Sequence, residues 1–324
     1  MEMMYAAAIA ETLRRLLRED KRVVLLGEDI GSYGGAFRVT KGFLKEFGPE
    51  RIIETPISEG SVMGVAVGMA MRGMRPVVEI MFMDFITLCM DQILNHGAKF
   101  PAMFGMEIPV VVRTPAGGGR GYGPTHSQSL ESLLNPIPGI EIVAPATPQD
   151  ACGLLRSAIA SPRITIFVEG KTLYGVKGEV DLDAPAVPIG RAAVAQSGRD
   201  ITITAFGRMV PETLRAAGLL AQTGVEAEVI DLRTVKPLDM DTVAASVEKT
   251  SRLVTVEEGP LAGGIGAEIA ASVFERAFFA LDAPIRRVAA ADGPVPASPA
   301  LEKKHLPDAE RIAAAVRAVM AANG

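Results

Sequence analysis

The chain has 324 residues, enough for about two domains and a sizeable core. Hydrophobic residues make up 48% of it and charged residues 22%, which is ordinary for a globular protein and excludes a disordered chain. The net charge of -5, without a long basic block, argues against nucleic acid and anionic membranes as partners.

The chain begins with MEMMYAAAIAETLRRLLRED, which carries acids among apolar residues and predicts an amphipathic helix over 3–18 rather than a signal peptide. No uncharged run approaches the ~20 residues of a membrane span. Cys89 and Cys152 lie in apolar runs without CxxC spacing. This favours buried, reduced thiols in a cytoplasmic protein over a disulfide or a metal site.

Short, β-branched and almost continuously apolar runs then alternate with Ala-rich runs, which is typical of an α/β fold with a parallel sheet. The expected strands are RVVLLGEDI, RIIETP, RPVVEIMF, IPVVVRTP and IEIVAPAT. The expected helices between them cover 60–71, 85–98 and 148–160.

The stretch KGEVDLDAPAVPIGRAAVAQSGRD is rich in Pro, Gly and Asp and lacks helical periodicity, so it predicts a linker. A second α/β set follows, with strands ITITAFG, VEAEVIDL, RLVTVEEG and PIRRVAA, and helices over 210–223, 239–250 and 266–280. We therefore expect one domain over 1–180, a linker over 181–198 and a second domain over 199–324.

The stretch IETPISEG joins a strand to the next expected helix. Ser58 is a candidate N-cap, and Glu59 falls in the first turn, where a carboxylate stabilises the helix dipole by ~0.3–1 kcal/mol. By spacing alone, Glu59 is a helix-start charge. Gly60, Gly64 and Gly68 share one helix face, although each glycine costs ~1 kcal/mol relative to alanine. That face indicates either close packing within the chain or contact with a partner subunit.

The stretch RTPAGGGRGYGPTHSQSLE is a glycine-rich loop after an apolar strand, and loops at strand ends of α/β sheets bind ligands. It carries His126 among hydroxyl and amide side chains. This residue is either a structural loop histidine or part of an active site. A single histidine without a cysteine or carboxylate cluster argues against zinc, and the lack of a GxSxG elbow argues against a serine hydrolase.

Together these stretches resemble the beta subunit of the thiamine-diphosphate-dependent first component of 2-oxoacid dehydrogenase complexes, of the pyruvate, branched-chain and acetoin type. The likeness covers almost the whole chain, and its markers are GEDIGSYGGAFRVTKGF, ETPISEG, GMAMRGMRPVVEIMFMDF, DQILNHGAK, THSQS, DLRTVKPLD, SVEKTSRLVTVEEG, LDAPIRRV and LEKKHLPDAERI. It implies two α/β domains with parallel sheets, a thiamine pyrimidine-binding domain followed by a transketolase C-terminal-like domain.

The resemblance also assigns residues. Glu59 matches the glutamate that hydrogen-bonds the aminopyrimidine ring of the cofactor and favours its imino tautomer, which can take a proton from the thiazolium carbon. Phe85 matches the aromatic residue that stacks on the pyrimidine. Met81 and Ile57 match nearby apolar contacts, with plain core residues as the alternative. His126 matches the histidine that assists acyl transfer to a lipoyl group.

Some members hold a monovalent cation such as K⁺ through backbone carbonyls, and the matching positions here are Val110, Ala158 and Ser161. Thiamine enzymes hold the diphosphate through Mg²⁺ bound by a GDG motif. This chain lacks GDG, and its nearest match is ADG at 291–293. We therefore expect a separate alpha subunit to supply the diphosphate and Mg²⁺ half of the site, in an α₂β₂ heterotetramer.

The resemblance predicts an oxidoreductase that decarboxylates a 2-oxoacid, with pyruvate as the first candidate, and passes the acyl group to a lipoyl group on a dihydrolipoyl acyltransferase core. The segment FPAMFGME at 100–107 is shorter than in the family, and the flanks of His126 also differ, which leaves the 2-oxoacid and the acceptor open. The alternatives are the C-terminal half of a split transketolase acting on sugar phosphates, or a non-catalytic member that binds an alpha-like partner.

Overall fold

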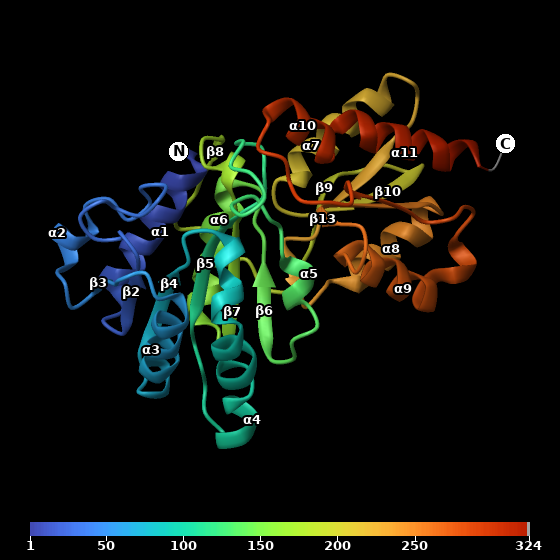
Figure 1. The fold of residues 1–324 in the computed structure, drawn as a ribbon. Coiled ribbons are helices and arrows are strands. Elements are labelled where there is room, and N and C mark those ends of the chain that lie inside the picture. Colours follow the sequence, from blue (N-terminus) through green and yellow to red (C-terminus); the bar gives the residue numbers. More distant parts are fainter. Residues whose placement is uncertain (323–324) are drawn as a thin grey trace. The chain divides into compact units, whose positions relative to one another are not determined.

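The computed structural model describes residues 1–322 (Figure 1). The chain forms two compact units. Unit 1 comprises Met1–Ala116 and Pro136–Ile189, and unit 2 comprises Gly117–Asn135 and the chain from Gly190 onward. Each unit contains its own sheet, so the predicted α/β class with two parallel-sheet domains is confirmed.

Six parallel strands form the sheet of unit 1, in the order β6-β7-β5-β4-β2-β3. Every residue of β2, β5 and β7 is buried, as strands covered on both faces require. The strands are β2 Val23–Gly27, β3 Ile52–Glu54, β4 Arg75–Glu79, β5 Val111–Ala116, β6 Ile140–Val143 and β7 Ile164–Gly170. Two further strands, β1 Glu2–Met4 and β8 Lys177–Glu179, pair antiparallel in a separate two-stranded sheet.

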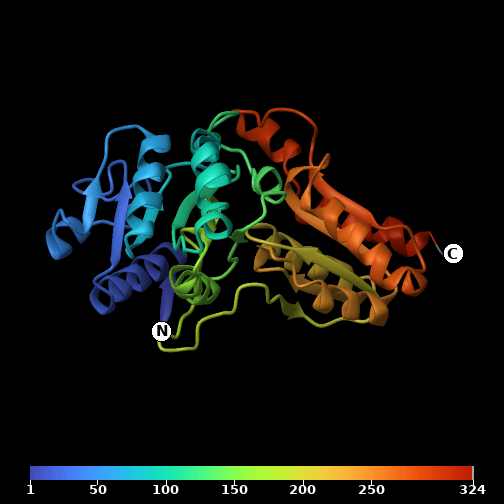
Figure 2. The ribbon, with the colours of Figure 1, turned by 90° about the horizontal axis from the view of Figure 1, so that it is seen from below.

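Helices cover both faces of this sheet, with α1 Tyr5–Glu19 and α6 Pro148–Ala160 on one face and α3 Glu59–Met71 on the other (Figure 2). In α1 the core residues Tyr5, Ile9, Leu13 and Leu17 recur every four positions, and at most 1% of each is exposed. This spacing aligns them on one helix face, which packs into the main core together with α6. Shorter elements complete the unit: α2 Phe43–Phe47, α4 Phe100–Phe104 and η3 Lys171–Leu173.

The helix expected over 85–98 differs most from its prediction. It forms a 3₁₀-helix, η1 Met83–Cys89, and a π-helix, η2 Gln92–Gly97. At Gly97 an added Cβ would lie 1.9 Å from Cδ1 of Ile164 in β7, so a larger residue there would force the Ile164 side chain to move. The strand β7 itself is absent from the strands expected from the sequence.

The sheet of unit 2 has the order β14-β13-β10-β11-β9, parallel except for the antiparallel edge strand β9. Helices α7 and α11 pack together on one face, and α8 and α9 on the other (Figure 1). The bounds are β9 Ala193–Gln196, β10 Ile201–Ala205, α7 Met209–Ala221, β11 Ala227–Asp231, β12 Thr234–Lys236, α8 Met240–Thr250, β13 Leu253–Pro260, α9 Ile265–Ala277, η4 Phe278–Ala280, β14 Arg286–Ala290, α10 Pro299–His305 and α11 Ala309–Ala321.

The units divide the chain differently from the boundaries expected from the sequence. Segment 181–189 packs on α6, where Ser157 Oγ donates to the carbonyl of Val187 at 2.6 Å, whereas β9 lies in the sheet of unit 2. Segment 117–135, with the short helix α5 Glu131–Leu134, also belongs to unit 2, because its backbone amides donate to side chains of that unit.

Both cysteines, Cys89 and Cys152, are buried free thiols, as predicted. Within the described residues, no helix is both long enough and apolar enough to cross a membrane.

Candidate active site

Four of the predicted site residues follow two strands of unit 1. Ile57 and Glu59 come after β3, and Met81 and Phe85 come after β4. Both strands pair in parallel with β2, and the last residue of each lies opposite Gly27. The two connections therefore leave the same carboxyl edge of the sheet, the edge at which ligands bind in open α/β folds.

Glu59 is the first residue of α3. Ser58 is the N-cap residue, but its side chain makes no cap hydrogen bond. The Glu59 side chain is half-buried, and its charge acts on two neighbours. Burial first and then the charge of Glu59 raise the pKa of the Glu28 carboxyl group, and the same two causes raise the pKa of the Cys89 thiol to about 12.

Glu28 is an acidic neighbour of Glu59 that the sequence analysis missed. It follows directly after β2, in GEDIG, and β2 lies between β3 and β4 in the sheet. The sequence did contain a signal for Glu28, namely an acid directly after a buried strand of a parallel sheet. The carboxyl ends of neighbouring strands share one edge, so such an acid lies near the other residues of that edge.

The apolar residues at this edge differ in exposure. Phe85 lies in η1, half-buried, with its ring edge-to-face with Phe82 at 6.2 Å between centroids. Met81 is also half-buried, whereas Ile57 is 81% exposed. Ile57 is therefore not a core residue of this chain, and the core alternative stays open only for Met81.

The helix face with three glycines has two different environments. An added Cβ on Gly60 would lie 3.1 Å from the carbonyl of Leu88, so α3 approaches η1 closely at that point. Gly64 has ordinary contact distance to Gln92, and Gly68 has nothing within 4 Å. Packing within the chain accounts for Gly60, and the far end of the face is open.

A buried ion network, absent from the sequence prediction, lies behind this edge. Arg113 in β5 donates to Glu169 in β7 at 2.7 and 2.9 Å and to Glu79 in β4 at 2.8 Å, and the hydroxyl of Tyr174 donates to Glu169 at 2.7 Å. Burial acts to lower the pKa of Arg113, but the charges of Glu169 and Glu79 outweigh it and hold that pKa above its ordinary value. Charged residues within otherwise apolar strands were the signal for this network.

His126 belongs to unit 2, whereas Glu59 belongs to unit 1. The histidine is half-buried, and its Nδ1 lies 3.0 Å from Oγ1 of Thr125. The loop closes at its base, where the amide of Gly117 donates to the carbonyl of Gln128 at 3.1 Å. The Thr125 hydroxyl is thus a hydrogen-bond partner of His126 Nδ1. Which of the two atoms donates depends on the tautomer of the imidazole ring.

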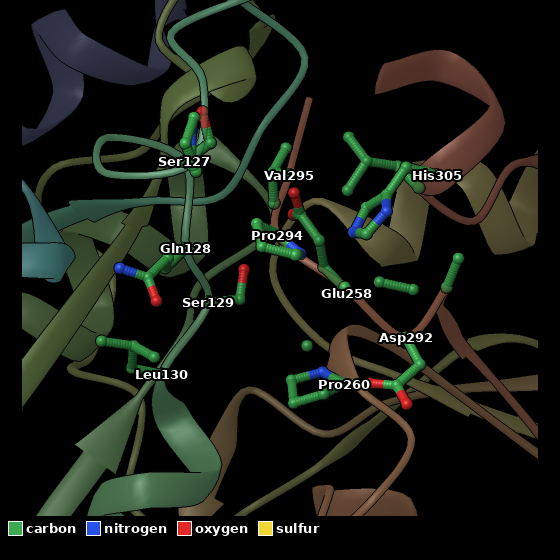
Figure 3. Close-up of a pocket in the computed structure, with 16 residues that line it drawn as sticks. Ser127, Gln128, Ser129, Leu130, Glu258, Pro260, Asp292, Pro294, Val295 and His305 are labelled. Atoms are coloured by element: carbon green, nitrogen blue, oxygen red, sulfur yellow. The ribbon is translucent and has the colours of Figure 1, made fainter. Parts of the chain in front are cut away.

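The residues after His126 border a cavity of about 480 Å³ within unit 2. Figure 3 shows Ser127, Gln128, Ser129 and Leu130 along one wall, with residues of the opposite wall including Pro294, Glu258 and His305. Ser127 is 2% exposed, and its Oγ has no hydrogen-bond partner among the described residues. This part of the loop therefore lies over open space instead of a filled core.

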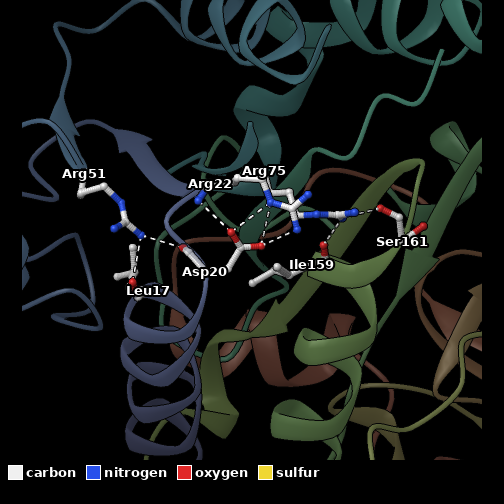
Figure 4. A network of polar contacts seen from close by, with 7 residues as sticks. All are labelled: Leu17, Asp20, Arg22, Arg51, Arg75, Ile159 and Ser161. Carbon is white, nitrogen blue, oxygen red and sulfur yellow. Dashed lines mark hydrogen bonds and ion pairs between the residues drawn. The ribbon is translucent and has the colours of Figure 1, made fainter. Parts of the chain in front are cut away.

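The three carbonyl groups assigned to a monovalent cation lie in unit 1. Each already accepts a hydrogen bond: Val110 from an amide of β7 at 2.8 Å, Ala158 from the amide of Ser161 at 3.3 Å, and Ser161 from Nη1 of Arg75 at 3.3 Å. Figure 4 shows the Arg75 guanidinium reaching Ser161 and Ile159. A carbonyl oxygen has two lone pairs, so each of the three carbonyls keeps one acceptor position, but the Arg75 guanidinium places a positive charge beside that of Ser161.

Among residues 1–322, no group of three or more His, Cys, Asp or Glu side chains is placed to hold a metal ion.

Comparison with known families matches residues 1–177 to the pyrimidine-binding domain of transketolase and residues 190–312 to the transketolase C-terminal domain. A solved structure described as an inactive beta4 tetramer of a split-gene transketolase superposes with a TM-score of 0.84, covering 99% of this chain and 100% of its own, at 24% identity. At that identity the likeness shows the fold alone.

Curated relatives are more similar in sequence. The acetoin:2,6-dichlorophenolindophenol oxidoreductase subunit beta of Cupriavidus necator is 45% identical, over 97% of this chain and 96% of its own. Its counterpart in Bacillus subtilis is 43% identical, over 94% and 93%. The mitochondrial pyruvate dehydrogenase E1 component subunit beta-1 of Oryza sativa is 42% identical, over 98% and 86%. The chain therefore belongs to the family of beta subunits of the thiamine-diphosphate-dependent first component of 2-oxoacid dehydrogenase complexes, with the domains of the transketolase superfamily.

Proposed function

We propose that this chain is the beta subunit of a 2-oxoacid dehydrogenase, of the pyruvate type, which decarboxylates its substrate oxidatively and transfers the acyl group to a lipoyl group. The observation that carries the proposal is the position of Glu59, at the start of α3 and at the same sheet edge as Phe85. A carboxyl group and an aromatic ring are the two kinds of group that an aminopyrimidine requires of this domain.

Glu59 would hydrogen-bond the aminopyrimidine and hold the proton that sets its tautomer, with Phe85 stacked on the ring and Met81 and Ile57 in apolar contact. Thiamine diphosphate, when bound, supplies the nucleophilic carbon that attacks the 2-oxo group. Glu28, whose pKa is raised by burial and then by the charge of Glu59, places a second carboxyl group near this site.

The chain supplies one half of such a site. It has no GDG motif for Mg²⁺ and diphosphate, and these would come from an alpha subunit in an α₂β₂ assembly. The exposed apolar side chains Ile57, at 81%, and Val65, at 54%, together with the open Gly68, give that subunit a surface to cover.

His126 would assist transfer of the acyl group to the lipoyl arm of a dihydrolipoyl acyltransferase core. A monovalent cation such as K⁺ on the carbonyl groups of Val110, Ala158 and Ser161, and a cytoplasmic location, complete the proposal.

Acetoin is the second candidate substrate. Two relatives named for acetoin are 43% and 45% identical to this chain, about as similar as pyruvate dehydrogenase subunits at 42–44%. The short segment 100–107 contains α4, contacts η2 and leaves Met103 61% exposed.

The decisive experiment uses alpha and beta chains produced together, with thiamine diphosphate and Mg²⁺, and compares pyruvate, branched-chain 2-oxoacids, acetoin and sugar phosphates. Glu59→Gln is expected to lower turnover by about 10²–10⁴-fold, the usual contribution of a proton-transferring group. Glu54→Gln, an exposed acid at the end of β3, is the matched control and should stay active. Full activity of Glu59→Gln, or of the beta chain alone, would overturn the proposal, and turnover of sugar phosphates would favour the split transketolase.

His126→Ala separates the two half-reactions. Acyl transfer to a lipoyl domain should fall far more than decarboxylation measured with an artificial electron acceptor. Equal losses in both assays would remove the role given to His126.

A further inference from the structure

The glycine-rich segment 117–123 is held by two buried carboxylates from distant parts of unit 2. The amide of Gly118 donates to Glu258 of β13 at 2.6 Å. The amides of Gly119 and Gly121 each donate to one oxygen of Glu302 in α10, both at 2.9 Å. Only 3% of Glu302 and 9% of Glu258 is exposed. One carboxylate thus bridges two amides on either side of Arg120.

The backbone of this segment depends on that contact. Gly119 and Gly121 adopt φ values of 89° and 69°, in the left-handed region, and both of their amides donate to the carboxylate of Glu302. At Gly118 an added Cβ would lie 2.8 Å from Leu306 and 2.9 Å from Oε1 of Glu302, so the loop lies directly against α10. A chain with this many glycines loses much conformational freedom when it is ordered, and hydrogen bonds to a charged acceptor offset that cost.

The part of the loop that follows His126 is largely buried, with Ser127 2% and Ser129 8% exposed. Residues Ser127 to Leu130 border the cavity of about 480 Å³, whose other wall includes His305 and Leu306 of the same C-terminal region (Figure 3). The amides of Gly119 and Gly121 therefore hold the loop on one side of His126, and α5 follows on the other side.

We propose that Glu302 is a positioning residue for the active-site loop: by accepting the amides of Gly119 and Gly121, it holds the loop that presents His126. The link to catalysis rests on the function proposed above for His126, whereas the link to loop order does not. Glu302 touches neither substrate nor cofactor in this account and acts only through the backbone.

Unit 2 contains a closely matched control. Glu257 is also 3% exposed and also accepts two backbone amides, those of Ile265 and Gly266, both at 2.9 Å. These amides begin α9 and lie outside the loop. Glu257→Gln therefore changes the same chemistry at the same burial without touching segment 117–123.

The test compares wild type, Glu302→Gln and Glu257→Gln in the complex of alpha and beta chains. Arg120 is an exposed trypsin site between the two tethered amides, so cleavage after it reports directly on the tether. In Glu302→Gln one oxygen is replaced by an NH₂ donor that faces an amide donor, and cleavage after Arg120 should become at least about tenfold faster. Hydrogen exchange should rise in a peptide that covers 117–123, and neither effect should appear in Glu257→Gln.

The same variants give a functional readout. Glu302→Gln should lower acyl transfer to a lipoyl domain by about tenfold or more while decarboxylation with an artificial acceptor stays within about twofold. Unchanged cleavage and exchange in Glu302→Gln, or equal changes in Glu257→Gln, would overturn the proposal. If His126→Ala leaves acyl transfer intact, the role of His126 is wrong, but cleavage and exchange still decide whether Glu302 holds the loop.

Discussion

The guanidinium of Arg113 meets the carboxylate of Glu169 through two hydrogen bonds of 2.7 and 2.9 Å, with only 2% and 0% of the two side chains exposed. The pair joins β5 to β7 in the middle of the unit 1 sheet, next to the edge that carries Glu59. Two carboxylates, Glu169 and Glu79, share this one cation, and burial raises the pKa of Glu79. The network keeps three charges inside a sheet that is otherwise apolar.

Arg113→Met is expected to destabilise the chain by about 3–5 kcal/mol, because it leaves Glu169 and Glu79 buried without a cation. Urea unfolding of the beta chain measures this. Arg199→Met is the control, since the ion pair of Arg199 with Glu226 is 73% and 54% exposed and should contribute about 0–1 kcal/mol.

A second variant tests the cause of that loss. The triple variant Arg113→Met, Glu169→Gln and Glu79→Gln removes the two uncompensated charges. It should lose less free energy of unfolding than Arg113→Met alone. If the triple variant is the less stable of the two, lost packing rather than buried charge explains the effect.

Much of the fold follows from local sequence. The strand β2 is a short apolar run between polar turns, and the four-residue spacing in α1 gives its buried face directly. Features set by distant contacts do not follow in this way. Gly97 in the π-helix η2 packs against Ile164 of β7, and segment 117–135 joins unit 2 through contacts to Glu258 and Glu302, more than 100 residues away in sequence.

In the candidate site, too, some features follow from local sequence and others depend on distant contacts. Spacing alone makes Glu59 a helix-start charge, which is also its place in the structure, and only the resemblance to a family gives it chemistry. The interaction of Glu59 with Glu28 and Cys89 depends on the order of strands in the sheet, which no local pattern encodes.

The raised pKa of Glu131 predicts how the stability of the chain depends on pH. Glu131 is 5% exposed, and burial, with added repulsion from Glu258 and Glu257, raises its pKa to about 8 from the ordinary value of 4.5. Between these two values the folded chain keeps a proton that the unfolded chain has lost. The stability contributed by protonated Glu131 is therefore full below pH 4.5 and is lost as the pH rises through 8, with a slope of at most about 1.4 kcal/mol per pH unit.

Glu131→Gln should flatten this dependence and gain stability relative to wild type as the pH rises from 5 to 9. Urea unfolding at each pH measures the difference between the two chains. Glu248→Gln removes the same charge at an exposed position of α8 and should leave the slope unchanged. If the difference in free energy of unfolding between wild type and Glu131→Gln is constant from pH 5 to 9, Glu131 is ionised throughout that range.

A cation held by the carbonyls of Val110, Ala158 and Ser161 should make thermal stability depend on K⁺, because an ion that binds only the folded state adds RT ln(1 + [K⁺]/Kd). The unfolding midpoint should be higher in KCl than in tetramethylammonium chloride at equal ionic strength. Ser161→Ala keeps the carbonyl and should keep this response, although it loses the 2.7 Å hydrogen bond to Glu141. Arg75→Met removes the positive charge that contacts the Ser161 carbonyl and should strengthen the response to K⁺. Equal midpoints in both salts, for wild type and for Arg75→Met, would contradict a bound ion at these carbonyls.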